Sequence, residues 1–350
     1  MEASRTPLRI AILLPHLGVY GGIRRFLELG RVWSARGHDV LLAVPRNASP
    51  REAWLPFPGR IGALEEAATG AWDAVLSPDP ALFLDAVGAA GRAVRIFYAV
   101  LERAPRAETA WRRADLVIAN SSGMIRHLAR RGIRAVDGIG GVNGAMFRPP
   151  AQDARPARAR GGAPLHALVY GRLSRRRKGS WRAAKAIEAA SRRSGVPVTL
   201  TLFDAPPPQD RGAGAPLPLS IPHRWVLNPS QEELAALYGD ADLFVSAERR
   251  AGWCNTAAEA MACGAAVACT PSGTEDFAVR GETAAVSRWP WTWALAGAVA
   301  RLLRDPALRG RIAEAGRRKI GEFTWERAAA SIERAIRSRM EERRHGGTTA

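Results

Sequence analysis

Short apolar runs alternate with helix-like segments along most of this 350-residue chain. Residues 8–17 form the first run, and a glycine-rich turn, GVYGG, follows it. Apolar residues at helical spacing then extend from residue 23 to Gly37, and residues 40–44 form a second strand-like run. This order is that of a βαβ unit, and continuous apolar runs are typical of strands that helices cover on both faces. The sequence therefore predicts an α/β fold that begins with a doubly wound parallel sheet.

The alternation is interrupted once and then starts again. Residues 151–163 are rich in proline, glycine and arginine and have no hydrophobic period, so we expect a linker there. We therefore expect an N-terminal Rossmann-like domain over residues 1–150 and a C-terminal one over 164–324. Two such domains would face a central cleft, where strand carboxyl ends and helix N-termini gather ligands.

The balance of charge is strongly basic. The chain has 51 basic and 33 acidic residues, a net charge of +18. Such a balance is typical of proteins that bind nucleic acid, anionic membranes or phosphorylated substrates. Only three of the basic residues are lysines, which indicates the composition of a GC-rich genome as an alternative cause. No nucleic-acid motif or aromatic stacking pattern accompanies the charge, so we expect no nucleic-acid partner.

Two further features bear on the compartment. No apolar run approaches the roughly 20 residues of a membrane span, and no signal-peptide cleavage site follows the apolar start of the chain. Cys254, Cys263 and Cys269 are an odd, clustered set in apolar segments, which favours packing roles over disulfides. We expect a cytoplasmic protein, and peripheral contact with the anionic inner face of a membrane stays open.

The segment NTAAEAMACG, residues 255–264, lies between two strand-like runs. Asn255 is a good N-cap and Gly264 a good helix stop, so the spacing predicts a short helix. Its N-terminus would offer backbone N–H groups to a phosphate, and Glu259 would accept hydrogen bonds from a ribose diol. The alternative is that Glu259 is a first-turn acid that favours the helix dipole.

The segment GRLSRRRKG, residues 171–179, follows the first strand of the second domain. Arg172 and Lys178 would converge there on a diphosphate and stabilise a departing nucleoside diphosphate. The alternative is a solvated basic face, because runs such as residues 175–177 are commonly exposed.

Three glycines follow the first apolar run of the first domain. Gly18, Gly21 and Gly22 would let the backbone approach a ligand closely. Their spacing is not that of a dinucleotide-binding turn, and no acid ends the second strand, so an NAD site is disfavoured.

These segments, in this order, resemble the GT-B glycosyltransferases, and specifically the retaining family 4 group that uses nucleotide sugars. The resemblance runs through nearly the whole chain. It includes ADLVIANSSGMIRHL, GVNGAMFRP, GRLSRRRKG, GWCNTAAEAMACG and SGTEDFAVRGETA.

The resemblance implies an enzyme that moves a sugar from a UDP- or GDP-sugar to an acceptor hydroxyl. Retention in this family is described as front-face attack assisted by the leaving diphosphate. The acceptor would be a saccharide, a glycolipid or a small molecule bound by the first domain. No metal or other cofactor is implied, and the sequence has no cluster with metal-ligand spacing. A C-terminal helix over residues 325–345 would pack back on the first domain.

The resemblance also assigns roles to residues. Arg172 and Lys178 would hold the donor diphosphate, and Glu259 the nucleotide ribose. The backbone near Gly21 and Gly22 would approach the diphosphate. Asn255 and Thr256 would contact phosphate and sugar through their amides.

The chain departs from the family pattern at two places. Ala251 stands where the family has a glutamate that contacts the transferred sugar, and Glu248 lies three residues earlier. The middle strand of the first domain has Tyr98 and Glu102 but no histidine near the expected reacting carbon; His16 is a candidate substitute. A catalytically silent protein that binds a nucleotide or saccharide, or that acts as a scaffold, is therefore the alternative function.

Two further segments have open interpretations. The tryptophans at 289, 291 and 293 favour core or interdomain packing over lipid contact. The last helix is basic and amphipathic, and its arginines at 337, 339, 343 and 344 are candidates for contact with anionic lipid.

Overall fold

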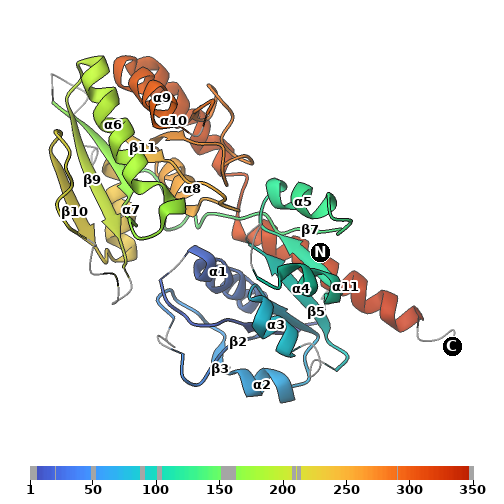
Figure 1. Ribbon diagram of the computed structural model, residues 1–350. Helices are drawn as coiled ribbons and strands as arrows, with labels where there is room; N and C mark the ends of the chain where they lie inside the picture. The colour runs from blue at the N-terminus through green and yellow to red at the C-terminus, as the bar shows by residue number, and fades with distance from the viewer. Residues whose placement is uncertain are drawn as a thin grey trace. The chain divides into compact units, whose positions relative to one another are not determined.

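The computed structural model describes residues 6–19, 21–48, 53–86, 91–100, 105–150, 163–206, 210, 214–289 and 291–346 (Figure 1). The chain divides into two compact units. Unit 1 comprises residues 1–141 and 324–350, and unit 2 comprises residues 142–323. Most of the predicted linker, residues 151–162, lies outside the described residues.

Unit 1 is built on a seven-stranded parallel sheet with the order β3-β2-β1-β4-β5-β6-β7. The strands are β1 (Arg9–Leu13), β2 (Asp39–Val44), β3 (Arg60–Ala63), β4 (Ala74–Ser77), β5 (Val94–Ala99), β6 (Leu116–Ala119) and β7 (Val136–Asp137). The strand order reverses between β1 and β4, so the loop after β1 lies at the point where such sheets bind ligands.

The helices of unit 1 include one from the end of the chain. They are α1 (Gly21–Ala35), α2 (Leu64–Thr69), α3 (Pro80–Ala86), α4 (Ala107–Arg113), α5 (Ser122–Ala129) and α11 (Trp325–Gly346). Helix α11 packs on α1 and along β5, β6 and β7. The indole N–H of Trp33 donates to the Ala329 carbonyl at 3.3 Å, and Arg343 pairs with Asp115 at 2.7 Å. These contacts fix the last helix of the chain to the first sheet.

The four C-terminal arginines at 337, 339, 343 and 344 all have partners within the protein. Arg337 contacts Glu333 and the Thr6 carbonyl, and Arg339 contacts Glu342 at 2.7 Å. The basic face of α11 is therefore largely occupied by contacts that hold the helix.

Unit 2 has a six-stranded parallel sheet with the order β10-β9-β8-β11-β12-β13. Its strands are β8 (Leu165–Tyr170), β9 (Val198–Asp204), β10 (His223–Leu227), β11 (Leu243–Ser246), β12 (Ala266–Cys269) and β13 (Ala285–Val286). Here the order reverses between β8 and β11. The sheet confirms the prediction of a second doubly wound α/β unit.

Helices cover both faces of this sheet. They are α6 (Ser180–Ser194), α7 (Gln231–Asp240), α8 (Asn255–Ala262), α9 (Thr292–Arg304) and α10 (Pro306–Ile320). Helices α6 and α9 pack side by side, whereas α8 contacts α7 and α10 (Figure 1). Right-handed crossovers explain this division, because the chain moves across the sheet in opposite directions on either side of β8.

The central strands were predicted because they are continuous apolar runs, and β11 and β12 are buried throughout. The edge strands β3, β7, β10 and β13 were not predicted. Strand β10 has only partly buried and exposed residues and begins with His223 and Arg224, so it lacks the long apolar run of the central strands. Helix α10 was missed as well, although Asp305 caps it and proline opens it.

Candidate functional site

The carboxyl ends of β8, β9 and β11 bring together most of the predicted site residues of unit 2. Arg172 follows β8, and Lys178 closes the short 3₁₀ turn η3 (Arg176–Lys178) that leads into α6. Helix α8 begins after β11 and contributes Glu259. Because β8 and β11 flank the reversal of strand order, the site lies where doubly wound sheets bind ligands.

Arg172 is almost completely buried, with 2% of its surface exposed. Its Nε lies 2.9 and 2.7 Å from the two carboxylate oxygens of Asp204, the last residue of β9. A second guanidinium nitrogen donates to the Ala205 carbonyl. The guanidinium is thus held by an internal acid that the sequence analysis did not identify.

Lys178 is more accessible, with 23% of its side chain exposed. Its Nζ lies 2.6 Å from Oε1 of Glu248, whose side chain is only 4% exposed. The other carboxylate oxygen of Glu248, Oε2, is buried and has no hydrogen-bond partner among the described residues. A buried carboxylate oxygen without a donor is costly, and it marks Glu248 as a group that would gain from a ligand hydroxyl.

Tyr170 lies between these two ion pairs. The guanidinium carbon of Arg172 lies 5.8 Å from its ring centre, and Nζ of Lys178 lies 5.4 Å from it. Burial, followed by the negative charge of Asp204, raises the pKa of the Tyr170 hydroxyl, which donates a hydrogen bond to Asp204. Tyr170 is therefore neutral, and the two cations and two carboxylates of the site balance one another.

The turn that carries Lys178 is docked on the loop after β11. The amide of Arg249 donates to the Arg177 carbonyl at 2.8 Å, and Arg182 donates to the Ala247 carbonyl at 3.2 Å. Gly179 has a φ of 67° and faces the Ala247 carbonyl so closely that a Cβ would not fit. The two loops therefore form one rigid edge of the site.

Five arginines surround this edge. Arg175, Arg176, Arg177, Arg249 and Arg250 are exposed, and none of them forms an ion pair with another described residue. We call these five residues the arginine rim. The alternative interpretation of residues 175–177 as a solvated basic face is compatible with their exposure.

Helix α8 begins at Asn255, so the residue at the N-cap position is Cys254 rather than Asn255. The helix has no acid in its first turn, because Glu259 lies one turn further in. Glu259 is 4% exposed, and Oε2 accepts a hydrogen bond from the Tyr238 hydroxyl at 3.0 Å. The interpretation of Glu259 as a first-turn acid is therefore wrong, whereas its role toward a ribose stays a prediction.

Thr256 and Asn255 occupy the first turn of α8, where amide groups point away from the helix. Ala251, in the preceding loop, donates its amide to the Ser272 hydroxyl at 3.0 Å. Gly273 packs against Ala251, and a Cβ on Gly273 would lie 2.7 Å from that of Ala251. The segment that would hold the transferred sugar is thus closely packed around a small residue.

The glycine loop of unit 1 lies at that unit's own reversal point, after β1. Gly21 and Gly22 open α1, and a Cβ on Gly22 would contact nothing within 4 Å. The fold does not require glycine at position 22, which is consistent with a ligand close to the backbone.

His16, the candidate substitute for the family histidine, accepts a hydrogen bond at Nδ1 from the Gly18 amide at 3.0 Å. Burial lowers the pKa of His16, so the ring is neutral and carries its proton on Nε2. In this state Nε2 is a hydrogen-bond donor.

Tyr98 and Glu102 belong to the stretch in which the family has its histidine. Tyr98 is buried in β5, receives a hydrogen bond from Arg25 at 2.9 Å and donates to the Gly138 carbonyl. Burial raises its pKa, and its contacts explain it as a structural residue. Glu102 lies outside the described residues.

All three cysteines are buried and free. Burial raises the pKa of each thiol, Cys254, Cys263 and Cys269, to about 12. They are therefore protonated packing residues at neutral pH. Across the described part of the chain, no three His, Cys, Asp or Glu side chains gather as metal ligands would.

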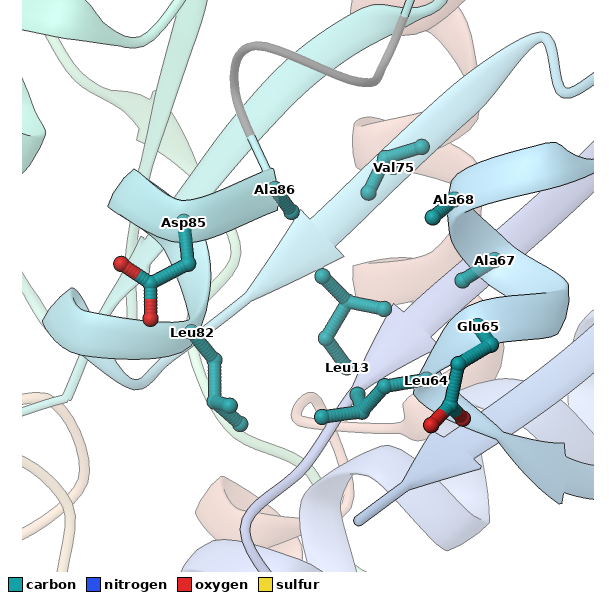
Figure 2. A pocket seen from close by; sticks show the side chains of 9 residues that line it. All are labelled: Leu13, Leu64, Glu65, Ala67, Ala68, Val75, Leu82, Asp85 and Ala86. Carbon is teal, nitrogen blue, oxygen red and sulfur yellow. The ribbon is translucent and has the colours of Figure 1, made fainter.

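Unit 1 also has an apolar hollow of about 260 Å³ over β1 and β4 (Figure 2). Leu13 and Val75 form its floor, and alanines of α2 and α3 leave it open. Glu65 and Asp85 stand at its edge and not at its centre. No residue of the predicted site lines it.

Asp204 and Tyr238 are the residues that the sequence analysis missed. Asp204 ends a buried strand, and an acid at that position was the available signal. Tyr238 lies on α7, and its segment was not assigned to the site, so only the fold reveals its contact with Glu259.

Unit 2 contains a match to a known protein family. Residues 164–305 match the family model for glycosyl transferases group 1. No curated protein matches the sequence. None of the described helices is long and apolar enough to cross a bilayer.

Solved structures share the whole fold. HepE from Anabaena, solved with UDP and glucose, has a TM-score of 0.75 at 15% identity, covering 95% of this chain and 100% of its own. Sucrose-phosphate synthase from Thermosynechococcus elongatus has a TM-score of 0.75 at 19% identity, with 95% and 98% covered. Trehalose 6-phosphate synthase from Burkholderia multivorans reaches 0.67 at 12% identity, with 95% and 99% covered. The shared architecture is GT-B.

Proposed function

We propose that this chain, a glycosyltransferase of the GT-B fold with a group 1 region in unit 2, transfers a sugar from a nucleoside diphosphate sugar to an acceptor hydroxyl with retention. The observation that carries the proposal is Lys178, a partly exposed cation at the reversal point of unit 2, next to the N-terminus of α8. A cation beside the N-terminus of a helix is a combination that a diphosphate binds.

We propose the following course for the reaction. The bond between the sugar's anomeric carbon and the diphosphate oxygen breaks, and a bond from the acceptor oxygen to that carbon forms on the same face. The acceptor's proton passes to the leaving diphosphate. Lys178 would offset the negative charge that develops on the diphosphate, so no side-chain base is required.

Glu248 is the group that we assign to the transferred sugar. Its Oε2 is buried without a donor, and a sugar hydroxyl would supply one. When the diphosphate takes over Lys178, Oε1 also becomes available to a hydroxyl. Glu248 would thereby supply a carboxylate that position 251, an alanine, does not.

A direct contact between Arg172 and the diphosphate stays an untested prediction, and the Arg172 guanidinium already pairs with Asp204. We therefore propose an indirect role, in which Arg172 holds the end of β9 and the loop after β8 together. Glu259, held by Tyr238, would accept hydrogen bonds from the ribose, and Asn255, Thr256, Gly21 and Gly22 would approach the donor through their backbones.

UDP-sugars are the donors to test first, since HepE was solved with UDP and with UDP-glucose. The purified chain would be given a panel of UDP- and GDP-sugars with lipid and polysaccharide extracts as acceptors, and free nucleoside diphosphate would be measured. Release from one donor, lost in Lys178→Ala but kept in Lys185→Ala, supports the proposal. Lys185 is a matched control because it lies on α6 and pairs with Glu188.

The second candidate is a silent nucleotide-binding protein, and the pairing of both cations with internal acids favours it. Under this hypothesis UDP or GDP binds, but no donor in the panel releases its nucleotide. Measurable binding combined with silence across the panel would replace the first proposal with this one.

A further inference from the structure

Three tryptophans within five residues are exposed on unit 2. Trp289, Trp291 and Trp293 expose 56%, 57% and 64% of their surfaces, so the expectation of packing in the core of unit 2 is wrong for all three. Packing between the two domains, the other expectation, stays untested. We call these residues, together with Arg288, the tryptophan surface. Large apolar side chains gathered on a protein surface mark an interaction site, whereas single ones do not.

The described residues on either side of the tryptophan surface are anchored to unit 2. The Ser287 amide donates to the Cys269 carbonyl at 2.8 Å, and its hydroxyl donates to the Trp289 carbonyl at 2.6 Å. Trp291 occupies the N-cap position of α9, whose residues Leu295 and Val299 are buried in the core of the unit. The tryptophan surface therefore joins a strand end to a helix that packs in the core.

Between the acids Glu282 and Asp305, the charged residues of this segment are all basic. Residues 283–304 contain no aspartate or glutamate, but they contain arginines at 288, 301 and 304. Arg288 and Arg301 are exposed. A saccharide platform would need carboxylates or amides to hydrogen-bond the sugar hydroxyls, and this stretch has no Asn or Gln either.

Indoles with neighbouring arginines are suited instead to the headgroup region of a lipid bilayer. Tryptophan places an apolar ring and a polar N–H at the level of lipid headgroups, and arginine pairs with their phosphates. We infer that the tryptophan surface binds the headgroup region of an anionic bilayer. The inference does not depend on the donor assignment, and it differs from lipid binding by α11, whose arginines contact the protein itself.

The test uses the full chain with vesicles of phosphatidylcholine alone or mixed with phosphatidylglycerol. Sedimentation would measure binding, and brominated lipids would report whether the indoles enter the headgroup region. The variant is Trp289→Ser combined with Trp291→Ser and Trp293→Ser. Trp181→Ser is the matched control, because Trp181 is 39% exposed on α6, outside the tryptophan surface.

We expect binding to the mixed vesicles, quenching by brominated lipid, and a loss of at least about tenfold in affinity only in the triple variant. Added salt should weaken binding by the arginines but leave part of it intact. Unchanged vesicle binding in the triple variant would overturn the inference. A wild-type chain that does not bind anionic vesicles would also overturn it. Normal vesicle binding with impaired transfer to a soluble saccharide would instead identify a sugar platform. Unchanged circular dichroism and UDP binding in the triple variant would show that the fold survives.

Discussion

At the scale of single residues, the site is defined by two cations that already have internal partners. Lys178 is partly exposed, and our proposal places it at the donor diphosphate. We expect Lys178→Ala to lower kcat/KM by roughly a hundredfold, about 3 kcal/mol in the transition state. Steady-state kinetics beside Lys185→Ala tests this, and a nearly normal kcat/KM would exclude the diphosphate role.

Arg172→Ala should behave differently. It would leave the Asp204 carboxylate, 1% exposed, without its cation. Breaking a buried pair in this way costs about 3–5 kcal/mol of folding free energy. Urea unfolding of unit 2 should therefore detect it, and removing both charges with Asp204→Asn should recover part of the loss. A stable but inactive Arg172→Ala would assign the residue directly to the donor.

Glu248→Gln separates two effects of one carboxylate. It removes the charge that pairs with Lys178, so nucleoside diphosphate should bind more tightly. If Glu248 holds the transferred sugar, kcat should fall at the same time. Calorimetry with UDP and kinetics with the full donor measure the two effects separately, and an unchanged kcat would remove Glu248 from the sugar site.

At the scale of elements, α11 depends on a buried carboxylate. Burial alone would raise the pKa of Asp115, but hydrogen bonds from Arg95 and the charge of Arg343 lower it to about 2. The carboxylate therefore stabilises the fold above about pH 4, by about 2 kcal/mol, and this contribution is lost as pH falls toward 2. Arg343→Ala should flatten the acid limb of the stability curve, which urea unfolding at several pH values measures. A wild-type profile in that variant would contradict the role.

Cys269 ends strand β12, and Cys254 and Cys263 occupy the cap positions before and after helix α8. All three are buried thiols with pKa values of about 12. In the folded protein near pH 8 they should react with a disulfide reagent far more slowly than free cysteine does. Urea should make all three react at once. Fast reaction of any thiol in the native protein would show that its segment opens.

At the scale of the whole molecule, the sequence predicts the sheets better than it predicts the site. Continuous apolar runs such as those of β8 and β11 could be recognised directly, because helices bury both of their faces. Strand β10 could not, because its residues are half exposed at an edge. The pairs Arg172–Asp204 and Lys178–Glu248 join residues 32 and 70 positions apart, and only the folded sheet brings them together. The exposure of the tryptophans was equally hidden, since aromatic residues near a helix start are more often buried.

The arginine rim has a consequence for the timing of donor capture. The interior cations are balanced by their own carboxylates, so they attract a distant anion only weakly, whereas the rim is unbalanced and exposed. Its field reaches about 8 Å at physiological salt and farther in dilute buffer. An approaching nucleotide is therefore accelerated by residues that need not hold it afterwards. The association rate constant should fall steeply with ionic strength while the dissociation rate constant hardly changes, so that one group of residues governs arrival and another governs residence.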